Sequence, residues 1–460
     1  MPGTSFFLSR RSRARLILGI ALTCSGGASY AFDLMTAYSE ALNNDPVFRS
    51  AAKENEGAQA NRIIGRAALM PQIGVNYYTA ANNSKISGPV YTNGPNVITN
   101  RAYPSNNSAV QLTQPLFNLD ALARYKQGIA QSDAGAAKFI YQSQDLLVRV
   151  LQAYTDVLYA QDQLSFLTAQ RNSYLEQFNV NTRLYQKGEG TITDALETQG
   201  IYEISESQVI DAKDALENAR RKLIDLTGAA SIKPSELGIL IKDFKVMPVS
   251  PSDFSDWNEL ALMNNLEIRT MQAQLEVARQ EYNKNRAAFM PVVSVVASWG
   301  QQNSYYISTI NQNAVTSTVG IQASLPLFTG GETTGRTYQA LAGFEKAQSD
   351  LDATRNRVIT EMRKQYDLVV SSKAKVQALT RAVDSARELT KAMRKSVVGG
   401  VRINLDILVA DKTFASAQRD LAQAKYAYLL ATLKLKQAAG TLSFDDLEKV
   451  ALYFKRDSHG

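Results

Sequence analysis

The stretch VGIQASLPLFTGG, which runs from Val319 to Gly331, contains the junction between two kinds of structure. Val319, Ile321 and Ala323 alternate with small or polar residues, which is the period-two pattern of a β-strand with one apolar face. Beyond Gly331 no proline occurs as far as Val398, and apolar residues recur at spacings of three and four. The sequence therefore predicts a strand that ends at a Pro-Leu-Phe step and leads into a long helix.

The same order of signals occurs twice in the chain. Residues 42–47 are matched by 263–268 at an offset of about 221, and Met70-Pro71 is matched by Met290-Pro291. The Pro-Leu-Phe step that ends at Phe117 returns at Phe328, an offset of 211, and the segment 188–196 returns at 400–408, an offset of 212. Because chance similarity would not keep this order over four landmarks, we interpret the chain as a tandem duplication.

Period-two patterning covers residues 71–115 and, more clearly, 291–326. We expect two strands in each segment, about 9 to 11 residues long, which is typical of transmembrane β-strands. The expected loops are 82–107 and 303–314. Aromatic residues lie near the expected strand ends, where a membrane interface would be, namely Tyr77, Tyr78, Trp299, Tyr305 and Tyr306. The alternative is a half-buried sheet in a soluble sandwich.

Proline-free helical tracts follow both hairpins, over 118–186 and 333–398. Each tract would reach roughly 100 Å as a single rod, which is longer than a compact domain of this size allows. After Gly188 and Gly400 each half turns back into a second helical segment, over 191–226 and 403–438. The apolar seam of the second tract has a near-heptad spacing, and it contains Val358, Met362, Tyr366, Val369, Val376, Leu379, Val383, Ala386, Met393 and Val397.

Residues 1–31 have the three parts of a secretory signal peptide, with cleavage predicted after Ala31. Removing this segment takes away four arginines and no acidic residue, so the net charge falls from +7 to +3 and nucleic-acid binding loses its main support. The only cysteine, Cys24, is removed as well, and Thr23 before it does not fit a lipoprotein site. The mature chain is thus predicted to be exported and cysteine-free.

The composition excludes several classes of function. One cysteine and one histidine, His459, leave no material for a disulfide framework, a Cys/His zinc site or a His-dependent nucleophile. No apolar run after the N-terminus is long enough for a transmembrane helix. An enzyme such as a glycosidase with paired carboxylates would rest only on the presence of Asp and Glu. We therefore predict a protein that is not an enzyme and has no cofactor or metal.

Four membrane strands cannot close a barrel, because the open edges would leave backbone polar groups unpaired in lipid. Two copies would supply 8 strands and three would supply 12, and only the larger number leaves room for an open lumen, since a barrel of about eight strands fills with side chains. The sequence thus predicts a mainly α-helical protein with a shared membrane β-barrel, whose helical hairpins form a periplasmic tunnel.

Over essentially the whole mature chain, the sequence resembles the TolC-like outer membrane efflux proteins. The resemblance rests on the duplication, the opening at 42–46, the paired Pro-Leu-Phe steps with Gly330-Gly331, and the two Gly-x5-Asp turns. It implies a homotrimer with a 12-stranded barrel in outer membrane lipid. It further implies a passive exit duct for proteins or small toxic molecules, engaged by a periplasmic adaptor and an inner-membrane ABC or RND-type transporter.

In this family the turn-back region is the periplasmic entrance, held closed by polar links and lined by acidic residues. The resemblance places Thr193, Asp194, Arg402 and Asp406 at the entrance, and Gly188 and Gly400 at the rim that an adaptor would contact. Three copies of one carboxylate at a constriction would attract cations. The alternative role for both aspartates is helix capping or a favourable interaction with the helix dipole.

Two positions depart from the family pattern. Val397 stands where a latch tyrosine is common, and Val409 stands where a second acidic residue would lie. Asp411, two positions further on, should face away from Val409 by about 200°. We therefore expect one acidic ring and a weaker or rewired closed state.

A second hypothesis is a periplasmic coiled-coil scaffold without a pore. The cargo and the transporter class are not determined by the sequence, although the lack of a long polar tail after Leu442 slightly favours type I secretion. The predicted division of the chain is a signal peptide (1–31), a first repeat (32–228, hairpin about 72–117), a linker (229–252), a second repeat (253–440, hairpin about 291–327) and a C-terminal segment (441–460).

Overall fold

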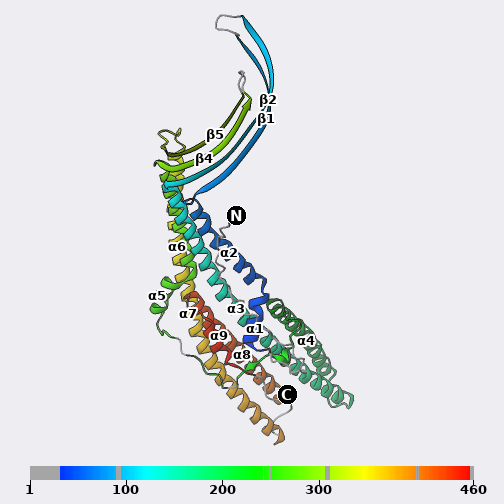
Figure 1. Ribbon diagram of the computed structural model, residues 1–460. Coiled ribbons are helices and arrows are strands. Elements are labelled where there is room, and N and C mark those ends of the chain that lie inside the picture. The colour runs from blue at the N-terminus through cyan, green and yellow to red at the C-terminus, as the bar shows by residue number, and fades with distance from the viewer. Residues whose placement is uncertain are drawn as a thin grey trace, which may run out of the picture.

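The computed structural model of the protein describes residues 32–89, 95–241, 243–247, 250–305, 311–399, 401 and 404–455. An antiparallel sheet stands at one end of an elongated molecule, and long helices run from it to the opposite end (Figure 1). The predicted signal peptide, residues 1–31, lies outside the described residues. The architecture is thus mainly helical with one four-stranded sheet, as the sequence predicted.

The sheet consists of β1 (Gln72–Pro89), β2 (Asn96–Phe117), β4 (Val292–Tyr305) and β5 (Asn311–Ser324), in the order β1-β2-β4-β5. Each half of the chain supplies one hairpin, and β2 pairs with β4 to join the two hairpins. Within the described residues, β1 and β5 each have one edge without a neighbouring strand. The sheet is therefore open on both sides in the single chain.

The two faces of the sheet differ in polarity. One row across all four strands is apolar, and it runs through Ile73, Leu112, Ala297 and Val319. The adjacent row points to the opposite face and is small or polar, and it runs through Gly74, Gln111, Ser298 and Thr318. The exposed fraction of Val319 is 80%, so the apolar face is uncovered in the single chain. The predicted period-two alternation is confirmed.

The strands are longer than the sequence predicted. They have 14 to 22 residues, so the expectation of strands just long enough to cross a membrane is wrong. Much of the expected loops, 82–107 and 303–314, continues the strands. Polar side chains bond across the ladder there, as when Thr79 donates to Asn106 at 2.6 Å and Asn82 donates to Ser105 at 2.9 Å. Hydrogen bonds between strands join backbone groups and need no apolar side chains. The strands therefore extend beyond the segments whose apolar residues alternate, from which their predicted ends were taken.

Apart from α9, the α-helices of the described residues come in pairs of nearly equal length, one member in each half. Their bounds are α1 Leu34–Asn44, α2 Pro46–Ala67, α3 Leu119–Gln186, α4 Ile192–Thr227, α5 Phe254–Asn264, α6 Leu266–Ala287, α7 Glu332–Val398, α8 Asn404–Ala438 and α9 Phe444–Ala451. α1 and α5 have 11 residues each, α2 and α6 have 22 each, and α3 and α7 have 68 and 67. Among the described residues, no helix is both long and apolar enough to cross a membrane. The duplication is thus visible in the helices themselves.

The predicted offset of about 221 at the start of each repeat is wrong by one. Asp45 caps α2 and Asn265 caps α6, which gives an offset of 220 for the backbone. The sequence match had aligned Asn44 with Asn265. These two residues share one role in the structure, since the side-chain amide of each donates to the end of a returning helix. Asn44 donates to the Thr227 carbonyl oxygen at 2.7 Å, and Asn265 donates to that of Ala438 at 2.8 Å. Asn265 therefore both caps α6 and bonds to the end of α8, whereas in the first half Asp45 caps α2 and Asn44 bonds to the end of α4.

The returning helices α4 and α8 stop at glycines in the left-handed region. Gly228 and Gly440 both have φ of +71°, and their tight approach leaves no room for a side chain. A Cβ at Gly440 would lie 2.2 Å from the Asn264 carbonyl oxygen. These glycines let the ends of α4 and α8 dock against the ends of α1 and α5.

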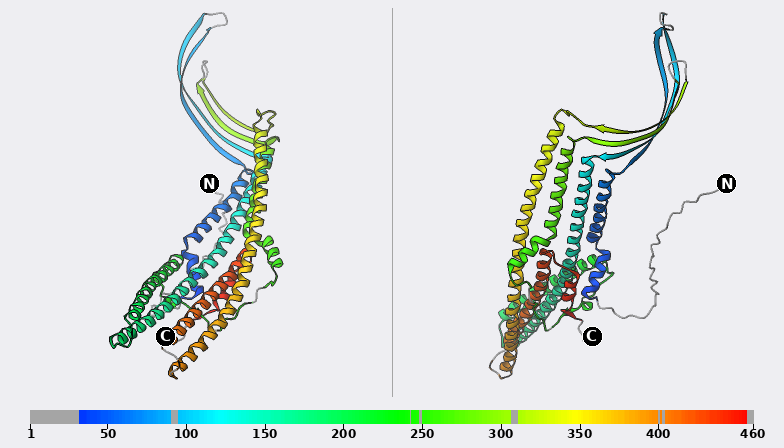
Figure 2. Two further views of the ribbon diagram at one scale, coloured as in Figure 1. Left: turned by 180° about the vertical axis from the view of Figure 1, so that it is seen from behind. Right: turned by 60° about the vertical axis from the view of Figure 1, so that its left-hand side comes forward.

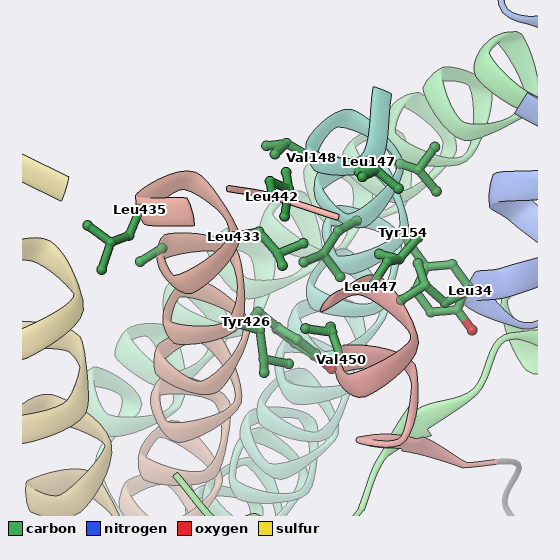
Figure 3. Packing of buried hydrophobic residues seen from close by; sticks show 14 of the residues in the cluster. Leu34, Leu147, Val148, Tyr154, Tyr426, Leu433, Leu435, Leu442, Leu447 and Val450 are labelled. Atoms are coloured by element: carbon green, nitrogen blue, oxygen red, sulfur yellow. The ribbon is translucent and has the colours of Figure 1, made fainter. Parts of the chain in front are cut away.

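The hydrophobic core lies about halfway along α3, where α3 and α8 pass α1 and α9 (Figures 2 and 3), and it continues between α5 and α7. Leu34, Tyr154, Leu433 and Leu447 are completely buried there. Two short strands, β3 (Ile239–Leu240) and β6 (Phe454–Lys455), pair beside this core, close to the short helix η1 (Pro234–Glu236). The predicted seam of α7 is also buried, with Val358, Met362, Val369 and Val376 at 4% exposure or less.

A pair of tyrosines ties the segment before each short helix to the long helices. The Tyr154 hydroxyl donates to the Phe32 carbonyl oxygen at 3.3 Å and accepts from the Gly238 N–H at 2.7 Å. In the second half, the Tyr366 hydroxyl donates to the Ser252 carbonyl oxygen at 2.7 Å. Phe32 and Ser252 both lie two residues before a helix, so the duplication extends to single hydrogen bonds.

Candidate functional site

The predicted entrance residues lie at the ends of two helical hairpins, α3/α4 and α7/α8, on the side of the molecule opposite the sheet (Figure 2). The turn between α3 and α4 is fixed by Gly188, which has φ of +75°. The Gly188 N–H donates to the Tyr185 oxygen at 3.0 Å, and the Glu189 N–H donates to the Leu184 oxygen at 2.9 Å. This is a Schellman motif, so Gly188 is needed for the turn whatever else it contacts.

The turn of the second hairpin repeats part of this pattern. The Val401 N–H donates to the Ser396 oxygen at 3.0 Å, which is the equivalent of the Glu189 bond. Gly400 and Arg402 lie outside the described residues, so their predicted roles at the rim and in the latch remain predictions.

Thr193 and Asp194 are exposed residues in the first turn of α4. The Thr191 hydroxyl oxygen caps the helix by accepting from the Asp194 N–H at 3.1 Å. The Asp194 carbonyl oxygen accepts from the Asn181 amide of α3 at 3.4 Å, which joins the two helices of the hairpin. The carboxylate thus belongs to the first turn of α4, where the helix dipole favours a negative charge.

Asp406 occupies the equivalent position, the third residue of α8, and is partly exposed. The two aspartates therefore share one local environment, the first turn of a helix that leaves the tip. This placement fits both interpretations, a helix-terminal charge and a member of an acidic ring, since the first turn faces the end of the hairpin.

Val397 and Val409 contribute no charge at the tip, and Val409 is 57% exposed. Asp411 accepts two hydrogen bonds from Arg394 of α7, at 3.1 and 3.2 Å. The carboxylate of Asp411 is thus engaged with α7. Sequence reasoning missed Arg394, although an arginine and an aspartate on the two helices beside a hairpin turn could have indicated the pair.

The neighbouring residue of α8, Lys412, contacts the other hairpin. Its ammonium donates to the Tyr174 hydroxyl of α3 at 3.0 Å and lies 5.7 Å from the centre of the ring. Burial opposes ionisation of Tyr174, but hydrogen bonds from Lys412 and Gln170 outweigh it, so the pKa of Tyr174 lies below its ordinary value. This contact joins residues of different repeats, and no spacing in the sequence indicates it.

A groove of about 180 Å³ runs between α3 and α8 beside this contact. Its lining is mostly apolar and includes Phe166, Ala169, Ser173, Val409 and Ala415. Within the described part of the chain, no group of three or more His, Cys, Asp or Glu residues is arranged to hold a metal ion.

Comparisons with known proteins agree with this architecture. Residues 37–229 and 257–441 match the family described as outer membrane efflux protein. The alkaline protease secretion protein AprF of Pseudomonas aeruginosa is 42% identical over 426 residues, which cover 93% of this chain and 88% of AprF. The proteases secretion protein PrtF of Dickeya chrysanthemi is 35% identical over 444 residues, which cover 96% of each chain.

The fold is that of a solved channel. The crystal structure of the Campylobacter jejuni CmeC outer membrane channel superimposes with a TM-score of 0.73, covering 91% of this chain and 89% of CmeC, at 18% identity. The two family matches fall on the two halves of the chain, so the tandem duplication is confirmed.

Proposed function

The chain belongs to the outer membrane efflux protein family, and from that premise we propose that three copies form a passive exit duct from the periplasm through the outer membrane. The observation that carries this proposal is the open four-stranded sheet with one apolar and one polar face. Three such sheets, paired edge to edge through β1 and β5, would close a 12-stranded barrel with lipid outside and water inside.

The helices supply the rest of the duct. α3 and α7 are long enough to span roughly 100 Å, so their ends would lie deep in the periplasm when the sheet is in the membrane. In a trimer, the side-by-side helices would form a wall that continues the barrel. The pore-free scaffold considered from the sequence finds no support in relatives that are named for secretion.

We infer type I secretion of proteins as the pathway, because AprF and PrtF are both named for protease secretion. Such a duct would work with a periplasmic adaptor and an inner-membrane ABC transporter. Gly188 and Gly400, at the rims of the two turns, are the proposed adaptor contacts. In this scheme the energy comes from the transporter, and the duct itself performs no catalysis.

The entrance is proposed to carry one acidic ring. Asp194 and Asp406 would each be repeated three times around the tip, with Thr193 and Arg402 in the polar links that hold it closed. Like charges at one constriction attract multivalent cations. Val409 leaves no carboxylate for a second ring at its level.

The test of the duct uses the purified mature trimer in a planar bilayer. The expected result is insertion and stable single-channel conductance. A protein that stays in solution without detergent and forms no pores would contradict the proposal.

The predicted signal-peptide cleavage after Ala31 has its own test. N-terminal sequencing of the exported protein should give Phe32 as the first residue.

The acidic ring is tested by block with hexamminecobalt(III) from the periplasmic side. Asp406→Asn should raise the blocking concentration about tenfold or more, because the ring loses three charges. The matched control is Asp350→Asn, which removes an exposed carboxylate of α7 that pairs with Lys346 away from the tip. Unchanged block in Asp406→Asn would place the ring elsewhere.

The polar links are tested separately. Arg402→Ser should raise the resting conductance by loosening the polar links.

A further inference from the structure

A cavity of about 240 Å³ lies between the start of α3 and the end of α6, next to the sheet (Figure 1). Leu119 and Leu122 of α3, together with Met290 just before β4, give it apolar walls. Lys126 and Arg286 add one positive charge from each helix. We call this cavity the boundary pocket, because it lies where the strands end and the long helices begin.

The apolar face of the sheet leads to the boundary pocket. Phe117, the last residue of β2, pairs with Val293, and Val293 lies on the same face of β4 as Ala297 because strand residues alternate between faces. Phe117 therefore ends the apolar face, and Leu119 lines the pocket two residues later. Phe117 and Met290 are each 45% exposed, so this apolar path is uncovered in the single chain.

The two cations of the boundary pocket have no carboxylate partner. Lys126 and Arg286 are exposed, and within the described residues neither forms an ion pair. The Arg286 guanidinium lies 5.5 Å from the centre of the Tyr282 ring of its own helix. By contrast, Arg124 in the same part of α3 pairs with Asp120 at 2.7 Å. Lys126 and Arg286 are therefore available to an anion from outside the chain.

The polar part of the pocket does not supply a counter-charge. None of the described residues that line it is acidic. Gln280, which is 5% exposed, donates to the Glu276 carboxylate at 2.5 Å and accepts from the Asn283 amide at 3.3 Å. Glu276 also lies 3.6 Å from the Arg279 guanidinium. The carboxylate on this stretch of α6 is thus already compensated, and the pocket keeps a net positive charge.

The boundary pocket would stay open in a trimer. α3 contacts α2 and α6, and α6 contacts α7, so the helices below the sheet form the row α2-α3-α6-α7 (Figure 2). Copies that join through β1 and β5 would meet at the outer helices of this row, α2 and α7. The pocket lies between the two central helices, where a neighbouring copy would not cover it.

We propose that the boundary pocket binds the headgroup of an anionic phospholipid of the periplasmic leaflet, with its phosphate between Lys126 and Arg286 and its acyl chains along the apolar face of the sheet. The inference rests on the proposed function, because only a sheet in the membrane brings the pocket to the level of the headgroups. Arginine and lysine bind phosphate oxygens through charge-assisted hydrogen bonds. Two unpaired cations also disfavour a headgroup with its own ammonium. One lipid per chain would fix the depth of the barrel in the membrane.

The test measures lipid binding to the purified mature trimer by native mass spectrometry. The trimer in mild detergent is incubated with palmitoyl-oleoyl phosphatidylglycerol or, in parallel, with phosphatidylethanolamine of the same acyl chains. The unmodified trimer should retain one phosphatidylglycerol per chain and should bind phosphatidylethanolamine about fivefold more weakly or less. Equal retention of the two lipids would overturn the proposal.

Removing both cations should abolish the preference. The double variant Lys126→Gln with Arg286→Gln should bind phosphatidylglycerol about tenfold more weakly, because the phosphate loses both partners. The matched control is Arg124→Gln, which removes a cation from the same part of α3. Arg124 precedes Lys126 by two positions, so the two side chains point about 200° apart around the helix. The control should bind phosphatidylglycerol as the unmodified trimer does.

The same spectra report whether each variant assembles, which is expected because both replaced cations are exposed. Unchanged binding in the double variant would overturn the boundary pocket. An equal loss in Arg124→Gln would overturn it as well, because the attraction would then belong to the charged surface in general. Conductance in planar bilayers separates this result from the proposed function. A trimer that conducts but retains no phosphatidylglycerol contradicts only the pocket, whereas a trimer that forms no pores contradicts the duct.

Discussion

The two halves of the chain are copies in their helices and differ where those helices are joined. In the first half, Asp45 caps α2 and forms a 2.7 Å ion pair with Arg149, while Asn44 holds the end of α4. In the second half, Asn265 caps α6 and holds the end of α8, without a charge. The difference shows that the position of the joint is fixed by the backbone, while the chemistry that stabilises it is free to vary.

The largest expected difference in stability loss between matched variants of the two halves is at Gly228 and Gly440, the glycines that end α4 and α8. Gly440→Ala places a methyl group against the Asn264 backbone, and Gly228→Ala places one against the Asn44 side chain, which can move. Both variants force alanine into the left-handed region, at a cost of about 1–2 kcal/mol. Gly440→Ala should cost about 3 kcal/mol or more in total because the backbone must shift. The thermal midpoint by circular dichroism should fall further for Gly440→Ala, and equal midpoints would contradict this.

The next largest difference in stability loss is expected between variants of the paired tyrosines, Tyr154 and Tyr366. Tyr154 is completely buried, and Tyr154→Phe leaves the Gly238 N–H without its 2.7 Å partner. An unpaired buried donor costs about 1–3 kcal/mol. Tyr366→Phe frees only the Ser252 carbonyl, which water can reach, and should cost about 1 kcal/mol or less. Urea denaturation of the two variants compares them directly, and a larger loss for Tyr366→Phe would reverse the comparison.

The smallest expected difference in stability loss is between variants of the capping residues Asp45 and Asn265, and it depends on pH. Burial raises the pKa of Asp45, but hydrogen bonds from Arg149 and from the backbone of α2 outweigh it, so the pKa lies below its ordinary value of 3.8. A lowered pKa stabilises the folded state above the unfolded pKa, and this stability is lost as the pH falls through the folded pKa.

Asp45→Asn should therefore cost about 1–2 kcal/mol at pH 7 and progressively less below about pH 4. The mirror variant, Asn265→Asp, keeps the cap but loses the amide that donates to Ala438. Stability measured across this pH range should show the narrowing gap for Asp45→Asn, in which a titrating group is removed. A gap that stays constant at low pH would mean that the ion pair with Arg149 contributes nothing.

Most of the fold was predictable from the sequence, because periodicity and glycine stops are local signals. The long tracts 118–186 and 333–398 became α3 and α7 with ends within one residue, and the alternation around Val319 gave the correct face of β5. The strand lengths were not predictable in this way, because polar residues extend a ladder as well as apolar ones do. The contacts of the candidate site were missed for a different reason. Lys412 and Tyr174 lie 238 residues apart, and their meeting depends on how two hairpins pack.

The unequal hairpins record how the gene changed after it was doubled. The offset between the halves falls from 220 at the Met-Pro steps to 211 at the Pro-Leu-Phe steps, so the second hairpin is the shorter one, while paired helices differ by no more than one residue. Inserting one residue in a packed helix turns its apolar stripe by about 100°, whereas lengthening a hairpin at its tip disturbs no partner. Insertions and deletions would thus have survived selection at the hairpin tips, and a foreign epitope should be accepted there more readily than anywhere along the helices.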